Sequence, residues 1–246
     1  SNSGKSVIIS NSKFDLKTFG QNDQNSKNQK NILTNARIVN SDFKIQGSNS
    51  QLIFNKAVDM FNNTVKDVGD FESPYIIFEG GSTTIKNLTI KDARSKDGSA
   101  FFSFKETNVY LENLKTSGES SFKLFEGTIS SFSLKDSTIS KVEQLNNNKL
   151  TSFIDLTGCK VTDDTNLVFE FINNKFDQNY VPVFRVDGQL KYNVLIKQNN
   201  FTKNEAARGS CICFDNYGWI RGKAKITIVN NTFSYRIKGG ISFSNS

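Results

Sequence analysis

The residues of this chain that could do acid–base chemistry are carboxylates, because its 246 residues include no histidine. Histidine is the commonest general acid or base and the usual activator of a serine or cysteine nucleophile. Two carboxylates can still cleave a glycosidic bond. Asp155 and Glu170 are the candidate catalytic pair, because the repeat pattern of the chain predicts that both point outward on adjacent rungs. A close like charge would raise the pKa of one of them, whereas an ordinary solvated pair is the alternative.

A second candidate site is the segment Tyr217–Arg221, which has the residues of a protruding loop that binds a sugar. A loop with these residues could stack on a sugar ring. The alternative is a loop whose aromatic residues cover their own corner of the fold. Tyr217, Trp219 and Arg221 are therefore the candidate glycan-binding residues.

Four N-glycosylation sequons are a third feature with chemical meaning. A chain of this composition is expected to contain about five of them by chance, so they are compatible with secretion without requiring it. If the chain enters a glycosylating compartment, the sugars are expected at Asn62, Asn87, Asn200 and Asn230.

The three cysteines, Cys159, Cys211 and Cys213, have no spacing that suggests zinc. An odd number cannot all pair within the chain. Cys211 and Cys213 are two residues apart in an apparent strand and point to one face, which disfavours a bond between them. We therefore expect buried free thiols, no metal site and no cofactor.

The charge of the chain fits either a soluble surface or an acidic partner. The formal net charge is +7, and the lysines and arginines are spread along the sequence. They do not gather beside aromatic residues, so nucleic acid is not an expected partner. No stretch approaches the roughly 18 apolar residues of a membrane span.

An internal repeat predicts the elements that must hold these residues. Its unit is an apolar residue, any residue, a turn-forming residue, two more of any kind and a second apolar residue. Asn is the turn-forming residue in seven of its ten copies. The copies begin at Ile9, Ile38, Ile53, Ile85, Leu111, Leu134, Leu156, Phe171, Ile196 and Ile228. Two intervals of 15 residues are short for a rung and leave the register open near Ile53 and Phe171.

The turn position gives the repeat a physical meaning. Two strands that meet at a tight corner need one residue with a left-handed backbone, which Asn, Asp and Gly adopt most easily. Gln198 is the exception, and Asn199 or Asn200 could form its corner instead. The pattern predicts an all-β fold, a single right-handed parallel β-helix of about ten rungs over residues 1–246, with a polar loop at 17–31. An antiparallel β-sandwich is the alternative, because it also consists of short alternating strands.

The segments Ile226–Phe233 and Val194–Phe201 resemble repeats of the pectin-lyase-like parallel β-helix superfamily. The resemblance covers most of the chain from Asn35 onward. It implies a right-handed helix that often has an asparagine ladder at a corner. Many members act on polysaccharides, but the Gly-His-Gly segment of polygalacturonases has no counterpart here.

A second resemblance is to the repeats of bacterial polymorphic outer-membrane proteins. Phe176–Asn179, Phe201–Asn204 and Gly239–Ile241 are similar to the Phe-x-x-Asn and Gly-Gly-Ala-Ile motifs of those proteins. The chain departs from the pattern because Gly-Gly-Ala-Ile is never intact. The similarity implies a surface-exposed, adhesin-like use.

The expected function is non-enzymatic: an extracellular or cell-surface β-helix that serves as a structural scaffold, adhesin or fibre component. One alternative is a polysaccharide-active lyase or hydrolase that uses Asp155 and Glu170. Another is a glycan-binding tailspike or lectin-like segment. Residues 239–246 begin a rung without a polar cap, so we expect a fragment of a longer chain whose open ends meet further rungs or other protein chains. Surface glycans are the other expected partner.

Overall fold

The computed structural model of the chain describes residues 7–17, 30–46, 51–66, 70–71, 74–95, 98–143, 151–157, 159–161, 167–187, 190, 192–206, 211–215, 225–234 and 240–244. Every regular element in these residues is a β-strand. The strands within each sheet pair in parallel. This arrangement rules out the antiparallel sandwich and confirms an all-β parallel β-solenoid. The solenoid makes about seven turns, fewer than the ten rungs expected.

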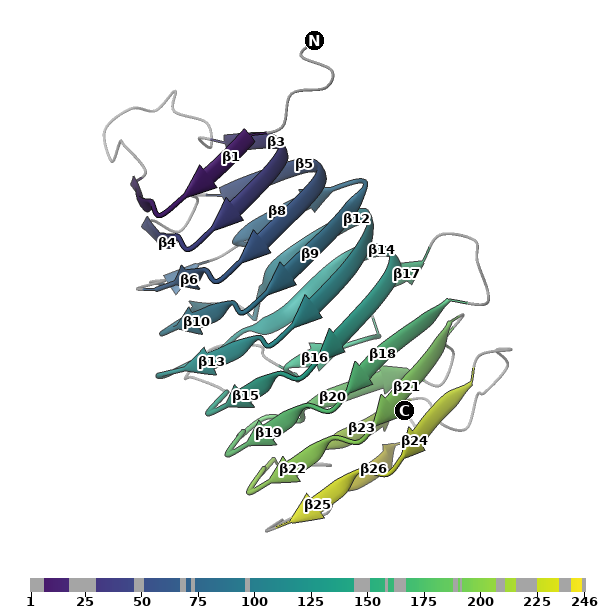
Figure 1. Cartoon of the computed structure of the whole chain (residues 1–246). Coiled ribbons are helices and arrows are strands. Elements are labelled where there is room, and N and C mark those ends of the chain that lie inside the picture. The colour runs from purple at the N-terminus through teal and green to yellow at the C-terminus, as the bar shows by residue number, and fades with distance from the viewer. Residues whose placement is uncertain are drawn as a thin grey trace, which may run out of the picture.

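The strands stack side by side along one axis, from the N-terminal to the C-terminal rungs (Figure 1). The largest sheet, here the first sheet, has eleven strands. Its strands are β1 (Val7–Ser10), β3 (Lys30–Val39), β5 (Gln51–Phe61), β8 (Ile76–Glu79), β9 (Ser82–Lys86), β12 (Ala100–Glu112), β14 (Lys123–Lys135), β17 (Lys160–Val161), β18 (Val168–Ile172), β21 (Asn193–Lys197) and β24 (Ile226–Val229).

The second sheet has nine strands and follows the first around each corner. They are β2 (Lys13–Lys17), β4 (Asp42–Gln46), β6 (Thr64–Val65), β10 (Thr89–Lys91), β13 (Lys115–Ser117), β15 (Thr138–Ser140), β19 (Lys175–Asp177), β22 (Asn200–Thr202) and β25 (Thr232–Ser234). The third sheet consists of β16 (Ile154–Asp155), β20 (Phe184–Asp187), β23 (Ile212–Asp215) and β26 (Ile241–Ser244). A two-stranded sheet pairs β7 (Asp70–Phe71) with β11 (Arg94–Ser95).

The first sheet aligns the leading apolar residues of eight copies of the repeat and adds Met60. The column is Ile9, Ile38, Met60, Ile85, Leu111, Leu134, Phe171, Ile196 and Ile228. Two predicted copies are wrong. Ile53 lies earlier in β5, opposite Ile32 and Ile77, and Leu156 follows β16 of the third sheet. Successive rungs in this column are 22 to 37 residues apart, so both short intervals disappear.

The turn positions of this column have the left-handed backbone that the repeat predicts. Gln198 forms its own corner with φ 57°, so the prediction that Asn199 or Asn200 replaces it is wrong. Positive φ angles of 49–57° occur at Asn11, Asn40, Asn62, Asn87, Asn113, Asp136, Asn173, Gln198 and Asn230.

A second bend lies inside the first sheet. Positive φ angles recur there at Lys56, Gly80, Gly81, Glu106 and Gly127. The pairing of β12 with β14 shifts register beside this bend. Strands of up to 13 residues therefore change direction without leaving the sheet.

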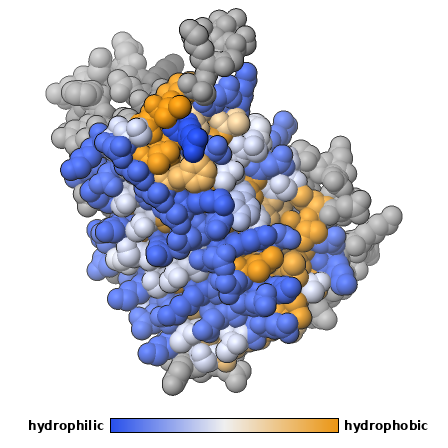
Figure 2. Space-filling model, viewed as in Figure 1, coloured by the Kyte–Doolittle hydropathy of each residue, from blue (hydrophilic) through white to orange (hydrophobic). Residues whose placement is uncertain are grey.

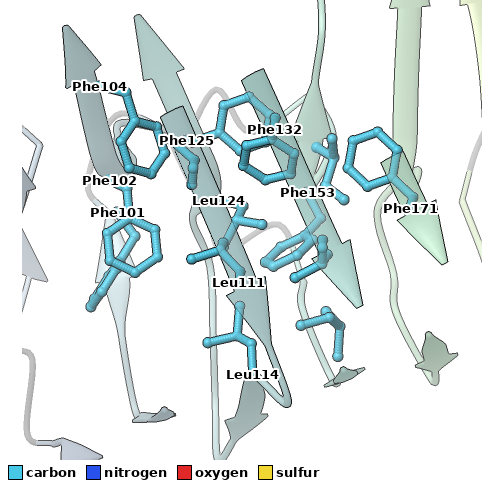
Figure 3. Close-up of a cluster of buried hydrophobic side chains, with 14 of the residues drawn as sticks. Phe101, Phe102, Phe104, Leu111, Leu114, Leu124, Phe125, Phe132, Phe153 and Phe171 are labelled. Atoms are coloured by element: carbon cyan, nitrogen blue, oxygen red, sulfur yellow. The ribbon is translucent and has the colours of Figure 1, made fainter. Parts of the chain in front are cut away.

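The core fills the inside of the solenoid, and phenylalanine dominates it (Figure 3). Equivalent positions on adjacent rungs are about 4.8 Å apart, a spacing at which flat rings can stack. Phe176, Phe201 and Phe233 form one such stack, with ring centroids 5.1 Å and 4.8 Å apart. Phe125 and Phe132 on β14 are closer, at 4.4 Å. This stacking explains why a chain with one methionine and one tryptophan has 22 phenylalanines.

A column of buried asparagines forms hydrogen bonds on the inner side of the corner between the first and second sheets. The backbone N–H of Ser137 donates to Asn174 Oδ1 at 2.9 Å. Asn174 N–H donates to Asn199 Oδ1 at 2.9 Å, and Asn199 N–H to Asn231 Oδ1 at 2.8 Å. Each amide oxygen thus satisfies a backbone N–H of the preceding rung.

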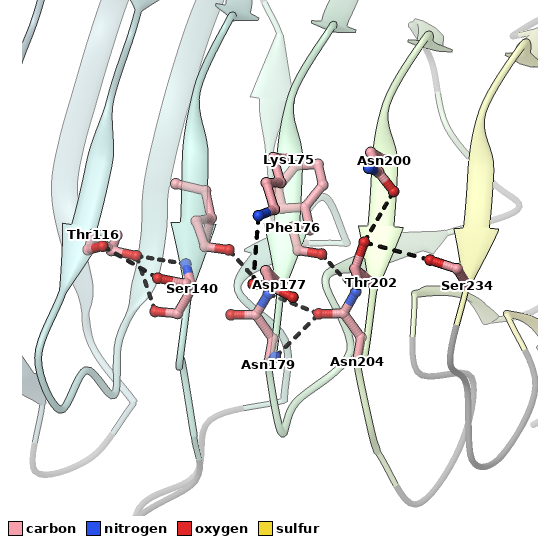
Figure 4. A network of polar contacts seen from close by, with 11 residues as sticks. Thr116, Ser140, Lys175, Phe176, Asp177, Asn179, Asn200, Thr202, Asn204 and Ser234 are labelled. Atoms are coloured by element: carbon pink, nitrogen blue, oxygen red, sulfur yellow. Dashed lines mark hydrogen bonds and ion pairs between the residues drawn. The ribbon is translucent and has the colours of Figure 1, made fainter.

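A second inner column follows the far end of the second sheet (Figure 4). Asn179 N–H donates to Asn204 Oδ1 at 3.1 Å, and Val142 N–H donates to Asn179 Oδ1 at 3.0 Å. Both asparagines also donate through Nδ2 to a buried carbonyl. The Phe-x-x-Asn segments therefore combine a stacked ring with a corner amide, which is a structural role.

Candidate functional site

A groove of about 320 Å³ lies on the outer face of the first sheet, across β9, β12, β14 and β18. Two columns of side chains line the groove, because alternation along each strand brings them to the same face of the sheet. Short serine and threonine side chains form its low floor, and longer side chains border them. The first column is Ser82, Asn108, Ser131 and Val168, and the second is Thr84, Tyr110, Ser133 and Glu170.

Tyr110 is at the centre of the polar contacts beside this groove. Its hydroxyl donates to Glu112 Oε2 at 2.8 Å, and Lys86 Nζ is 2.7 Å from the same oxygen. The ammonium groups of Lys86 and Lys135 lie 5.3 Å and 5.8 Å from the centroid of the Tyr110 ring, within cation–π range. Lys135 also pairs with Glu170 at 3.3 Å. Cations from the rungs on both sides therefore hold the ring of Tyr110.

The charges of this cluster reinforce one another. The hydrogen bond from Lys86, and then the one from Tyr110, lowers the pKa of Glu112. Burial, followed by the hydrogen bond to Glu112, raises the pKa of Tyr110. The hydrogen bond that Lys86 donates to Glu112 raises the pKa of Lys86. At neutral pH the cluster therefore presents a carboxylate, a neutral phenol and an ammonium group.

Asp155 and Glu170, the predicted catalytic pair, lie in different sheets. Glu170 is on β18 of the first sheet, opposite Ser133, whose Oγ is 3.4 Å from its Oε2. Asp155 is on β16 of the third sheet, opposite Arg185. The prediction that the two acids are neighbours is wrong, because it assigned the Leu156 copy of the repeat to the first sheet.

Asp155 belongs instead to an ion-pair network on the third sheet. Arg185 Nη1 is 3.5 Å from Asp155 Oδ2, and Arg185 Nε donates to Asp215. Asp155 also accepts hydrogen bonds from the backbone N–H and hydroxyl of Thr157, at 3.0 Å and 2.7 Å. The side chains of the two aspartates are only 11% and 17% exposed. One guanidinium therefore joins three rungs and satisfies two largely buried carboxylates.

Replacing Arg185 with methionine is expected to lower the free energy of unfolding by about 2 kcal/mol, because both carboxylates lose their cation. Arg94→Met is the matched control. Its ion pair with Glu119, at 3.6 Å, is exposed, so its loss should stay below about 0.5 kcal/mol. Urea unfolding of the two variants measures the difference. Equal losses would contradict the structural role of the network.

Tyr217, Trp219 and Arg221 lie outside the described residues. Their contribution to sugar binding stays a prediction. The groove at Tyr110 shows that the described part of the chain has a separate aromatic and polar surface of similar chemistry.

The four sequon asparagines are all described, and all four are exposed. Asn62 and Asn87 belong to an outer ladder in which each Nδ2 donates to the Oδ1 of the preceding rung, at 3.1 Å and 2.7 Å. Asn230 occupies a corner, and Asn200 begins β22. A sugar on Asn62 or Asn87 would therefore be attached to a nitrogen that holds the ladder. Glycosylation of the four stays a prediction.

None of the three cysteines forms a disulfide. Cys211 and Cys213 are buried, while Cys159 is half-buried. Burial raises the pKa of Cys159 to about 12, so it stays a thiol at neutral pH and is a poor nucleophile. Across the described ranges, no group of three or more metal-ligating side chains comes together. Nor does any helix in them have the length and hydropathy to cross a membrane.

The groove was not among the sites predicted from sequence. Tyr110, Ser133 and Glu170 each come one residue before a leading apolar residue of the repeat. Ser131 comes two residues before Ser133, so strand alternation places it on the same face. That alternation is a usable signal for both columns. Which residues of adjacent strands lie beside one another depends on the register of the strands. The repeat alone did not give that register.

Comparisons of this chain with models of protein families, with curated proteins and with solved structures give no match. The parallel β-solenoid is therefore the level at which the fold can be assigned. A functional argument has to start from the groove and from the solenoid that holds it.

Proposed function

We propose that this chain is a non-catalytic β-solenoid that binds a glycan along its first sheet, outside the cell or at the cell surface. Such a protein would act as an adhesin or a rigid structural scaffold. The observation that carries the proposal is the groove, where one aromatic ring lies beside hydroxyl, amide and charged groups held in register by four strands.

The groove has the mixture of groups that a sugar chain requires. A sugar ring has apolar C–H faces and a rim of hydroxyl groups, so it is recognised by aromatic contact together with hydrogen bonds. Tyr110 supplies the ring. Ser82, Asn108 and Ser131 supply donors and acceptors. Because adjacent strands are about 4.8 Å apart, an extended glycan that crosses them would meet the same type of contact on successive rungs.

The fold favours binding because the groove is formed before any ligand arrives. Its side chains project from paired strands whose corners and core are fully packed. Lys86 and Lys135 hold Tyr110, so little side-chain freedom is left to lose when a ligand binds. Preorganisation of this kind increases affinity by reducing the entropy lost on association.

Binding without cleavage is supported by the state of the carboxylates. Hydrolysis of a glycosidic bond needs one carboxylic acid with a raised pKa and a second carboxylate facing it. The pKa of Glu112 is lowered instead, and Glu170 pairs with Lys135. Asp155 is in another sheet. None of these three acids is arranged as a proton donor toward the groove.

Replacing Tyr110 with alanine is expected to weaken binding to the recognised glycan about tenfold, because the ring contact is worth roughly 1 kcal/mol or more. The ligand is first found by retention of the purified chain on a panel of immobilised polysaccharides. Calorimetry then compares the wild type with Tyr110→Ala. Thr227→Ala is the matched control, because Thr227 lies in the same outward row two rungs beyond Glu170, outside the groove.

The same panel separates the proposal from its alternatives. Unchanged affinity in Tyr110→Ala would contradict the groove as the binding site. Release of new reducing ends or unsaturated sugars, lost in Glu170→Gln, would support a polysaccharide-active enzyme instead. Absence of binding to every polysaccharide would leave a purely structural scaffold as the better reading.

The end rungs support a scaffold that meets other chains or further rungs. Figure 2 shows hydrophobic residues gathered at the end of the solenoid near β1 and β3, where Ile8 and Ile32 are 68% and 55% exposed. At the opposite end, Phe243 on β26 is 59% exposed and stacks on Phe214 of the preceding rung. Apolar surface of this kind is normally covered by a partner.

A further inference from the structure

The groove on the first sheet changes character at its C-terminal end. Its first column begins with the polar side chains of Ser82, Asn108 and Ser131 and ends at Val168 on β18. Val168 is 37% exposed, so its isopropyl group lies on the surface and not in the core. Hydrophobic residues also interrupt the hydrophilic surface in the C-terminal half of the solenoid (Figure 2). The groove therefore has a polar end at β9 and an apolar end at β18.

The next strand, β21, extends the apolar end of the groove. It places Asn193 opposite Val168 and Leu195 opposite Glu170, and both of its side chains are half-buried. Asn193 Oδ1 accepts a hydrogen bond from the backbone N–H of Lys225 at 2.8 Å. The amide NH₂ of Asn193 is therefore the group that it can offer to a ligand. Two apolar side chains, a carboxylate and an amide donor thus lie on two adjacent strands.

The charges at the groove disfavour an acidic ligand. Among the described residues that line the groove, Glu170 is the one charged side chain. The lysines beside it are paired, Lys86 with Glu112 at 2.7 Å and Lys135 with Glu170 at 3.3 Å. These four charges sum to zero, so the groove offers no unpaired ammonium group to a uronate or a sulfate. A ligand carboxylate at the apolar end would also be repelled by Glu170.

An acetamido group matches the side chains of the apolar end. Its methyl group fits against Val168 and Leu195, which a sugar with hydroxyl groups alone would leave without an apolar contact. Its N–H can donate to the carboxylate of Glu170, and its carbonyl can accept from the amide of Asn193. A site built for such donors and acceptors rejects an analogue that lacks them, because its own polar groups are then left unpaired.

We propose that the groove selects neutral glycans built from N-acetylated sugars, with an acetamido group held at the apolar end. This inference rests on the proposed function of the groove and names its class of ligand. Tyr110 would stack on one sugar ring, while the apolar end, two rungs farther along the sheet, would recognise the substituent of another. Ring stacking alone admits many sugars, so the apolar end supplies the selectivity.

The test uses hexasaccharides that share one backbone and differ in one substituent. Chitohexaose has the acetamido group, cellohexaose has a hydroxyl group in its place, and the fully deacetylated chitosan hexamer has an ammonium group. Calorimetry with the purified chain should show chitohexaose binding at least about tenfold more tightly than cellohexaose. An oligogalacturonate of the same length, which has carboxylates, should bind at least about tenfold more weakly than chitohexaose.

Replacing Val168 with threonine tests the methyl contact. Threonine keeps the branched shape that suits a strand but exchanges a methyl group for a hydroxyl. Val168→Thr should weaken chitohexaose binding about fivefold and leave cellohexaose binding unchanged. Val229→Thr is the matched control, because Val229 is 36% exposed on β24 of the same sheet but outside the groove. It should leave both affinities unchanged, and equal thermal midpoints would show that both variants fold.

Replacing Glu170 with glutamine tests the charge. Glutamine keeps an oxygen that accepts a hydrogen bond but removes the ion pair with Lys135. Glu170→Gln should therefore bind oligogalacturonate at least about threefold more tightly than the wild type does. Its affinity for chitohexaose should change less than about threefold, because the acceptor remains.

The outcomes that would overturn the inference differ from those that would overturn the proposed function. Equal affinity for chitohexaose and cellohexaose, or equal losses in Val168→Thr and Val229→Thr, would remove the selectivity. Tighter binding of the chitosan hexamer would show that Glu170 recognises an ammonium group instead. If the polysaccharide panel retains the chain and chitohexaose does not bind, the inference alone fails. If no polysaccharide retains the chain, the proposed function fails with it.

Discussion

Replacing Asn174 with leucine is expected to lower the free energy of unfolding by about 3–5 kcal/mol. Leucine has the same branched skeleton of heavy atoms as asparagine but cannot form hydrogen bonds. The change leaves the N–H of Ser137 and the carbonyl of Leu134 without their present partners, at 2.9 Å and 3.0 Å. It also removes one of the hydrogen bonds that Asn199 Oδ1 accepts. Each buried polar group left unpaired costs about 1–3 kcal/mol.

The preceding residue provides the control for this variant. Asn173 is exposed, has φ 56°, and its side-chain Nδ2 donates to Asp136 Oδ1 on the outer ladder. Asn173→Gly keeps the left-handed backbone and should cost less than about 1 kcal/mol. Guanidinium unfolding followed by circular dichroism measures both variants. If Asn174→Leu cost no more than Asn173→Gly, the inner ladder would not be what holds this corner.

The replacement Gly127→Ala is expected to destabilise the chain by about 4 kcal/mol or more. Gly127 lies opposite Phe104 in the pairing of β14 with β12 and has φ 117°. A Cβ at this position would overlap the carbonyl oxygen of Phe104, which is backbone and cannot rotate away. The backbone angle is also one that residues with a side chain rarely adopt. The two central strands of the solenoid would have to separate locally.

Gly80→Ala isolates the steric part of this effect. Gly80 is at the same bend of the first sheet and has φ 73°, but no atom lies within 4 Å of a Cβ built there. Its replacement should cost only the backbone strain, about 1–2 kcal/mol. Thermal unfolding of the two variants, with hydrogen exchange of β12 and β14, gives the comparison. Similar midpoints would show that the contact with Phe104 is relieved without loss of strand pairing.

The corners of the fold could be predicted because their cause is local. Asn62, Asn113 and Asn230 each follow a strand and adopt the left-handed backbone that asparagine tolerates. The same reasoning failed at Gln198, whose side chain has no such preference. There the corners of the rungs before and after it fix the backbone angle.

The register could not be predicted, because neighbours in a solenoid are separated by loops of variable length. Leu134 lies beside Phe171, 37 residues later, whereas Leu156 between them belongs to another sheet. The Leu156 copy satisfies the repeat in sequence, although it follows a strand of the third sheet. The error carried over to the candidate site, because it made Asp155 a neighbour of Glu170.

The residues that face outward could be predicted from alternation, but their partners could not. Tyr110 and Glu112 share a strand, so their common face follows from the sequence. The approach of Lys86 and Lys135 from two other rungs depends on the pairing of β9, β12 and β14.

By itself, the sequence determined the type of element, the corner residues and the lack of histidine chemistry, because these depend on side chains and their nearest neighbours along the chain. Tertiary structure alone decided which rungs touch, and with that the groove at Tyr110 and the network around Arg185. The physical reason is that parallel pairing joins residues one full turn apart. The length of each turn is set by its loops, and the sequence of a loop does not indicate which strands will pair.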